Sequence, residues 1–311
     1  MTLAILCSGQ GGQHADMFDL TGAAPQADAL FVQASRLLGA DPRVWVREAD
    51  PDARRENRTA QLLCTLQALA AAAMLDAVLP RRRCVAGYSV GELASWSIAG
   101  LIGAGETLDL ADARARAMDA ASSGDEGMAF VRGLPRERVA ALCADRDAAI
   151  AIANPGDACV IAGRRVDIDA IAAEAARDGA RLVTPICVRV ASHTRRLATA
   201  VPAFRAELAS VCVRRAPLPG TRLFSGIDGA VVLDVGDGLD KLARQIAEPV
   251  EWAATLAGCV EAGATAFLEL GPGRALAEMA ASAYPALPAR SLADFRSVDG
   301  LTSWLARVAA G

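Results

Sequence analysis

The sequence has 311 residues, which is long enough for one large domain or for a large domain that carries a small insert. The formal net charge is −4, so the basic excess that a nucleic-acid binder normally needs is missing. Although 53% of residues are hydrophobic, no apolar run reaches the roughly 18 residues that span a bilayer, and we expect a soluble protein without a membrane partner.

The N-terminal segment predicts a buried strand. Residues 3–7 are a continuous apolar run of the kind found in parallel sheets, and residues 8–13, Ser-Gly-Gln-Gly-Gly-Gln, form a glycine-rich turn after it. No basic region precedes the run and no cleavage site follows it, so we expect no targeting signal.

Eight cysteines are scattered along the chain without a Cys-x-x-Cys pair. This spacing favours neither a zinc site nor a redox motif, and we expect no metal. Most of them lie in apolar runs, which predicts reduced thiols in the core of a cytoplasmic protein. They are Cys7, Cys64, Cys84, Cys143, Cys159, Cys187, Cys212 and Cys259.

A G-x-S-x-G motif follows two helical patterns at 26–38 and 59–79. Residues 84–88 predict a short strand that leads into Ser89, and Gly91-Glu92-Leu93-Ala94 opens the next helix. The pentapeptide alone is common, but a strand before it and a helix after it are the context in which it indicates a nucleophile.

Residues 127–190 follow a different rhythm. Strands are predicted at 127–133, 148–154, 158–163 and 180–188, with helices at 136–144 and 167–178. This β-α-β-β-α-β order is typical of a ferredoxin-like subdomain.

Helix and strand alternate again after this segment. Helices are predicted at 194–211, 239–247 and 252–262, with strands at 222–225 and 266–270 before Gly271-Pro272-Gly273. We therefore predict an α/β protein: an α/β-hydrolase-like large domain with a parallel sheet, formed by residues 1–126 and 191–311, and an inserted subdomain at 127–190.

A serine nucleophile needs a base within hydrogen-bonding reach, and histidine is the usual one. The chain has only two histidines. His193 stands where a strand run ends and a helix begins, a common place for catalytic groups in α/β folds, whereas His14 is expected at the surface. No aspartate stands in an obvious motif to orient the base, although Asp228 and Asp237 are candidates.

Attack on a thioester creates an oxyanion, which main-chain N–H groups at a turn or helix N-terminus can stabilise. Val90, directly after Ser89, is well placed to supply one such group. The glycine-rich turn after the first strand is the leading candidate for the second. Arg195 and Arg196 are candidates to meet an anionic substrate or an acidic partner.

Five segments together resemble the malonyl-CoA:acyl-carrier-protein transacylase family. They are Gly9 to Gln13, Gly87 to Glu92, Arg114 with Met118, Ala191-Ser192-His193 and Gly271-Pro272-Gly273. They occur in the family's order over nearly the whole chain. Two departures stand out: Tyr88 replaces the histidine usual before the nucleophile, and Gln61-Leu62 replaces a glutamine-proline pair.

The resemblance implies roles for individual residues. Ser89 would carry the acyl group, His193 would be the base, and the main-chain N–H groups of Gln10 and Val90 would form the oxyanion hole. Arg114 would bind the malonyl carboxylate, a role that suits the two-pronged geometry of a guanidinium. A main-chain carbonyl, expected at Glu251, would orient His193 in place of a carboxylate.

More closely, segments around residues 7–13, 86–93, 190–194 and 225–229 resemble the acyltransferase (epsilon) subunit of bacterial malonate decarboxylase. This implies transfer of malonyl from malonyl-CoA to an acyl-carrier protein, with no permanently bound cofactor. The acceptor arm would be phosphoribosyl-dephospho-CoA, or phosphopantetheine if the enzyme serves fatty-acid or polyketide synthesis. Other malonate decarboxylase subunits are further candidate partners.

Two other classes stay open from the sequence. A serine hydrolase would share the nucleophile motif, but it would be expected to show a carboxylate partner for the histidine and would give no reason for Arg114. A non-catalytic subunit that docks a carrier would need neither Ser89 nor His193.

Overall fold

The large sheet is parallel and is built around the predicted N-terminal strand. The computed structural model describes residues 1–310. The strand order is β10-β9-β1-β2-β7. The bounds are Leu3–Cys7 for β1, Arg83–Gly87 for β2, Thr221–Leu223 for β7, Ala266–Leu270 for β9 and Ala289–Ser291 for β10. Cys7 is paired with Gly87 on one side and Leu270 on the other, so the carboxyl ends of three strands meet at one edge.

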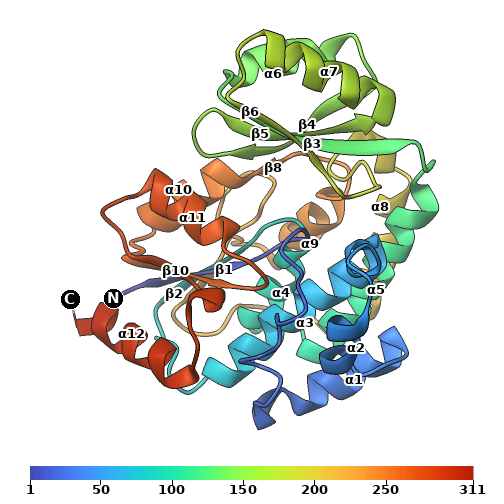
Figure 1. Ribbon diagram of the computed structural model, residues 1–311. Coiled ribbons are helices and arrows are strands. Elements are labelled where there is room, and N and C mark those ends of the chain that lie inside the picture. The colour runs from blue at the N-terminus through green and yellow to red at the C-terminus, as the bar shows by residue number, and fades with distance from the viewer. Residues whose placement is uncertain (311) are drawn as a thin grey trace.

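Helices cover both faces of this sheet (Figure 1). Leu3 and Ile5 of β1 pack into one hydrophobic cluster and Ala4 and Leu6 into another, which explains why the strand is apolar throughout. The helices of this part are α1 Asp28–Leu38, α2 Pro42–Glu48, α3 Asn57–Leu75, α4 Gly91–Ile98, α5 Ala104–Ala121, α8 Ala200–Ser210, α9 Val235–Arg244, α10 Trp252–Glu261, α11 Ala275–Ala283 and α12 Val298–Ala310. Short 3-10 helices lie at Pro25–Ala27 (η1), Ala53–Arg55 (η2), Arg195–Leu197 (η3) and Leu292–Asp294 (η4).

The longest helix of the described residues is α3, and it lies inside the molecule. Its residues from Ala60 to Ala71 are all buried. Among residues 1–310, no helix is long and apolar enough to cross a membrane.

A second sheet forms a separate layer above the first (Figure 1). Its order is β6-β3-β5-β4-β8. The bounds are Glu126–Arg132 for β3, Ala148–Asn154 for β4, Ala158–Arg164 for β5, Leu182–Ile186 for β6 and Val250–Glu251 for β8. Helices α6 (Arg136–Ala144) and α7 (Arg165–Arg177) lie on the face that points away from the large sheet. The order from β3 to β6 is β-α-β-β-α-β, and we propose residues 127–190 as the inserted subdomain.

Two features of the second layer and its surroundings differ from expectation. The short strand β8 comes from the C-terminal part of the chain and pairs in parallel with β4, so the second sheet takes a strand from outside the insert. The helix expected at 194–211 is broken into η3 and α8. Pro202 lies in the first turn of α8, where its ring prevents the helix from continuing backwards.

The cysteines are buried with two exceptions. Cys187 and Cys212 are exposed, so the prediction that all eight lie in the core is wrong for this pair. Cys187 follows β6 in the connection that returns to the large sheet, and Cys212 follows the end of α8. Both stand in connections between elements, where an apolar sequence run does not imply burial.

Candidate active site

Ser89 stands at a sharp turn between β2 and α4. It has a φ of 56°, a left-handed conformation that is unusual for a residue with a side chain. A Cβ on Gly87 would lie 2.1 Å from the Glu92 nitrogen, and one on Gly91 would lie 2.1 Å from the Cys7 carbonyl oxygen. Both glycines are therefore needed for the turn to fit against β1 and α4, which explains the G-x-S-x-G spacing.

His193 contacts Ser89 directly. Its Nε2 lies 2.8 Å from the Ser89 Oγ, and its Nδ1 lies 2.6 Å from the main-chain oxygen of Gln245. A carbonyl oxygen only accepts hydrogen bonds, so Nδ1 carries the ring proton and Nε2 is free to take the serine proton. Burial, reinforced by the nearby Arg114 cation, lowers the pKa of His193 to about 3, which keeps the ring neutral.

The expected position of the orienting carbonyl is wrong. Glu251 donates its N–H to Gly226 and accepts a hydrogen bond from the Thr255 hydroxyl with its carbonyl. The carbonyl that meets His193 belongs to Gln245, the C-cap of α9. The last carbonyls of a helix have no partner within the helix, so this one is available to the imidazole.

The two aspartates considered as a third catalytic group lie elsewhere. Asp228 and Asp237 each form an ion pair with Lys241, at 3.0 and 2.7 Å. His14, the other histidine, is exposed. The geometry therefore joins Ser89 to His193, and a main-chain carbonyl holds the histidine ring.

Two main-chain N–H groups lie in the turns beside Ser89. Val90 is the N-cap of α4, and Gln10 lies in the turn after β1. Within residues 1–310 neither N–H donates a hydrogen bond. A Cβ on Gly9 would lie 2.7 Å from the Tyr88 carbonyl oxygen, so the glycine-rich turn runs directly against the nucleophile turn.

Arg114 of α5 is a buried cation surrounded by amide groups. Its side chain donates to Gln61 Oε1 at 2.6 Å and to Gln245 Oε1 at 3.4 Å. Across the described part of the chain, no carboxylate lies within 4.0 Å of this guanidinium. Burial lowers its pKa to about 10, so it is still charged at neutral pH. A buried cation without a carboxylate is costly, and this one is suited to receive an anion.

Glu92 and Gln245 complete this polar cluster. Glu92 Oε2 accepts hydrogen bonds from the Gly226 N–H, at 3.0 Å, and from Gln245 Nε2. Burial raises the pKa of Glu92 to about 8. The sequence carries a weak signal for Glu92, since it occupies the first turn of the nucleophile helix, but none for Gln245 in an ordinary amphipathic helix.

A cavity of about 500 Å³ opens in front of Ser89 and His193. Its wall on the side of the second sheet is apolar and includes Met128, Phe130, Ile152 and Val160. Pro272, Gly273 and Arg274, which follow β9 of the large sheet, also line the cavity. The cavity thus lies between the two layers, with the nucleophile on the large sheet.

Residues 5–289 match the family described as acyl transferase domain. The chain belongs to this family. It is 29% identical to a malonyl CoA-acyl carrier protein transacylase of Mycobacterium tuberculosis (strain ATCC 25618 / H37Rv), over 97% of this chain and 99% of the relative. It is 27% identical to the protein of that name from Escherichia coli (strain K12), over 88% and 90%. The crystal structure of an acyl-carrier-protein S-malonyltransferase from Burkholderia pseudomallei 1710b superposes with a TM-score of 0.89 at 29% identity, covering 97% of this chain and all of that one.

Tyr88 lines the cavity of this acyl transferase beside the nucleophile. Its ring meets the Trp252 ring edge to face, with centroids 5.3 Å apart. Burial raises the pKa of its hydroxyl, and the Asn154 side chain lowers it in part. Tyr88 thus packs the turn that carries Ser89 against α10.

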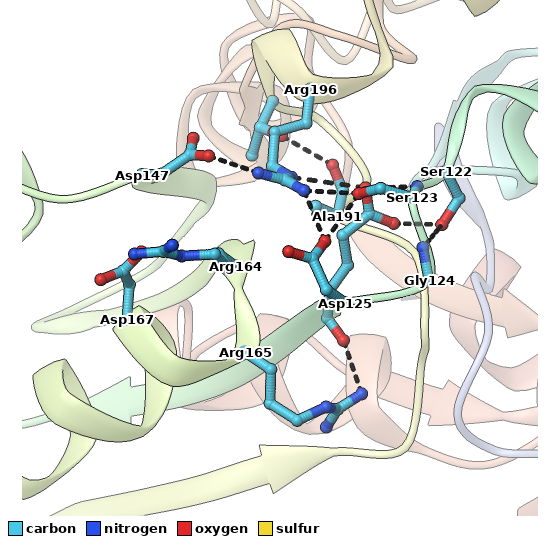
Figure 2. Close-up of polar contacts among 12 residues, drawn as sticks. Ser122, Ser123, Gly124, Asp125, Asp147, Arg164, Arg165, Asp167, Ala191 and Arg196 are labelled. Atoms are coloured by element: carbon cyan, nitrogen blue, oxygen red, sulfur yellow. Dashed lines mark hydrogen bonds and ion pairs between the residues drawn. The ribbon is translucent and has the colours of Figure 1, made fainter.

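Arg196 is not available to a substrate, contrary to expectation. Its guanidinium hydrogen-bonds Asp125 at 2.7 Å, Ser123 at 2.6 Å and Glu126 at 3.3 Å, and it also pairs with Asp147 (Figure 2). These partners lie where the chain enters β3 and β4 of the second layer. Arg196 of the acyl transferase therefore ties η3 to the second layer, whereas Arg195 is exposed.

Proposed function

We propose that this acyl transferase moves malonyl from malonyl-CoA to the thiol of an acyl-carrier protein, through an acyl group carried on Ser89. The observation that carries the proposal is the buried Arg114 cation, which has no carboxylate partner among residues 1–310 and belongs to the cluster that holds His193. The names of the relatives above point to the same donor and acceptor. A serine hydrolase would have no use for this cation.

The first half of the reaction follows from the 2.8 Å contact between Ser89 and His193. Ser89 Oγ attacks the thioester carbonyl while its proton passes to His193 Nε2. The oxyanion is held by the main-chain N–H groups of Gln10 and Val90. The carbon-sulfur bond then breaks, CoA takes the proton from His193, and malonyl stays on Ser89 as an ester.

The second half uses the same groups in the opposite direction. The carrier thiol gives its proton to His193 Nε2 and attacks the malonyl ester. The new tetrahedral intermediate collapses, Ser89 Oγ leaves, and it recovers the proton from His193. A neutral imidazole is needed at the start of each half, which agrees with its lowered pKa.

Arg114 would select the acyl group. A guanidinium can donate two parallel hydrogen bonds to the free carboxylate of malonyl, and acetyl offers no such group. Gln61 and Gln245 hold the guanidinium on its protein side with oxygen atoms alone.

Ser89→Ala tests the covalent step. Incubation with radiolabelled malonyl-CoA should label the unaltered protein and leave Ser89→Ala unlabelled. Ser95→Ala is the matched control, since Ser95 lies on α4, the helix that follows Ser89, and its hydroxyl donates to the Glu92 main-chain carbonyl, so this variant should label normally. Equal labelling of Ser89→Ala and the unaltered protein would refute the acyl-enzyme.

We further propose that the physiological acceptor is the carrier subunit of malonate decarboxylase. The support is the resemblance of the segments at 7–13, 86–93, 190–194 and 225–229 to the acyltransferase subunit of that enzyme. The test supplies malonyl-CoA with two carriers, one bearing phosphopantetheine and one bearing phosphoribosyl-dephospho-CoA. A higher kcat/KM for the dephospho-CoA arm is expected, and a preference for phosphopantetheine would favour a role in fatty-acid or polyketide synthesis.

A further inference from the structure

The Gln245 residue serves both the base and the buried cation. Its main-chain oxygen accepts from His193 Nδ1 at 2.6 Å, and its side-chain oxygen accepts from Arg114 at 3.4 Å. The residue is completely buried. Any rotation of this residue would therefore disturb the base and the cation together.

The side-chain amide of Gln245 has two orientations, and only one suits Arg114. A guanidinium carries donors alone, so the amide oxygen must face it. The amide nitrogen then points the other way, where the Glu92 carboxyl accepts its hydrogen bond. Without that acceptor the nitrogen would be buried and unpaired, which disfavours this orientation of the amide.

Glu92 itself is tied to the nucleophile turn. Its N–H donates to the Ser89 carbonyl at 3.0 Å, and its Oε2 accepts from the Gly226 N–H at 3.0 Å. Its other oxygen, Oε1, is buried and has no hydrogen-bond partner among the described residues. The carboxyl is thus fixed at one oxygen by two N–H donors, one of which is the Gln245 amide.

We infer that Glu92 is a positioning residue, which accepts a hydrogen bond from the Gln245 amide and thereby sets both the Arg114 guanidinium and the His193 ring. This inference rests on the proposed malonyl transfer. It assigns Glu92 the role of a hydrogen-bond acceptor, and no negative charge is required. The raised pKa of Glu92, about 8, agrees with a carboxyl that is mostly neutral at pH 7.

Two substitutions separate the role of residue 92 as a hydrogen-bond acceptor from any role of its negative charge. Glu92→Gln keeps an oxygen that can take both N–H groups, so kcat/KM for malonyl-CoA and the malonyl preference should stay within about threefold of the unaltered enzyme. Glu92→Leu removes the acceptor, and kcat/KM for malonyl-CoA should fall about 10- to 100-fold with a clear loss of preference over acetyl-CoA. Equal damage from the two substitutions would overturn the inference.

Gln67→Leu controls for a general loss of stability. Gln67 is a buried amide of α3 that hydrogen-bonds Thr21 and the Met17 carbonyl, away from the catalytic pair. The Gln67→Leu variant should have a lower melting temperature but an unchanged ratio of malonyl to acetyl transfer. If Glu92→Leu likewise lowers the melting temperature but keeps the ratio of malonyl to acetyl transfer, Glu92 has only a structural role and the inference fails.

A double-mutant cycle completes the test. Gln245→Leu keeps the main-chain carbonyl but removes the amide, so it should lose the malonyl preference as Glu92→Leu does. The double variant should be no worse than either single variant, and additive losses would contradict the inference. If Glu92→Leu does not fold, Gln245→Leu and Glu92→Gln carry the test: the first must lose the preference and the second must keep it.

Failure of the positioning role and failure of the proposed malonyl transfer give different results. Labelling of the unaltered protein by malonyl-CoA tests the function, and the comparison among variants at positions 92 and 245 tests the positioning role. Retained labelling with an unchanged acyl preference in Glu92→Leu would leave the function intact and reject the positioning role.

Discussion

The turns at Ser89 and His193 have the same unusual backbone, but they are held in different ways. Both residues have a positive φ, 56° and 64°. The Ser89 turn is fitted by its own glycines at positions 87 and 91, which allow β1 and α4 to approach. The His193 turn has no glycine beside it, and its N–H and Nδ1 bond to Ile246 and Gln245, which lie about fifty positions later.

This difference explains what the sequence could predict. The nucleophile turn is encoded within five residues, so Ser89 is recognisable from strand, turn and helix patterns. His193 is recognisable because the chain has only two histidines. Its support comes from residues far away in the chain, and short-range patterns cannot identify Gln245 or place the orienting carbonyl.

The fold shows the same contrast. The buried run of β1 and the β-α-β-β-α-β order were predictable because periodicity and length are local. The pairing of β8 with β4 was not, since two residues carry too little pattern to indicate a strand. The division of the chain at 126/127 and 190/191 stays a prediction.

Removal of the base should have the largest effect. His193→Ala leaves Ser89 without a proton acceptor, and the rate of acylation by malonyl-CoA should fall about 10²- to 10⁴-fold. Stopped-flow measurement of CoA release gives this rate. Asp237→Ala, which removes an aspartate paired with Lys241, should leave the rate unchanged. A His193→Ala rate within threefold of the unaltered enzyme would contradict the assigned base.

The close fit of the Ser89 turn, which depends on its glycines, can be tested by measuring the free energy of unfolding. In Gly91→Ala the new Cβ would lie 2.1 Å from a main-chain oxygen, so the free energy of unfolding should fall by about 2 to 4 kcal/mol in denaturant titration. Gly127→Ala is the control, because its Cβ would meet its nearest neighbour at 3.4 Å. Similar losses in the two variants would show that the nucleophile turn is not tightly fitted.

Arg114→Ala should alter acyl choice more than overall activity. We expect the preference for malonyl-CoA over acetyl-CoA to fall roughly 10- to 100-fold, as charge-assisted hydrogen bonds to a carboxylate are lost. Arg116→Ala is the control: Arg116 lies two residues later on the same helix, and its loss removes an ion pair with Asp112 at 2.7 Å. The assignment fails if both variants keep the same preference as the unaltered enzyme.

The pH dependence should be the smallest effect. The pKa of His193 is lowered to about 3, so kcat/KM for malonyl-CoA should be flat between pH 5 and 7. A fall with a midpoint near 6.5 would contradict the buried, carbonyl-bound ring. Stability has a definite sign as well: the unfolded chain takes up the imidazole proton near pH 6.5, before the folded one does, so this residue makes stability fall as pH drops from 6.5 towards 3.

The most direct test of the central claim is the amount of CoA released when enzyme meets malonyl-CoA without a carrier. A transferase with malonyl on Ser89 should release one equivalent of CoA per enzyme and then stop, and release should resume when a carrier with a free thiol is added. Continuous release without a carrier would identify a hydrolase. No release would contradict the serine-linked acyl group.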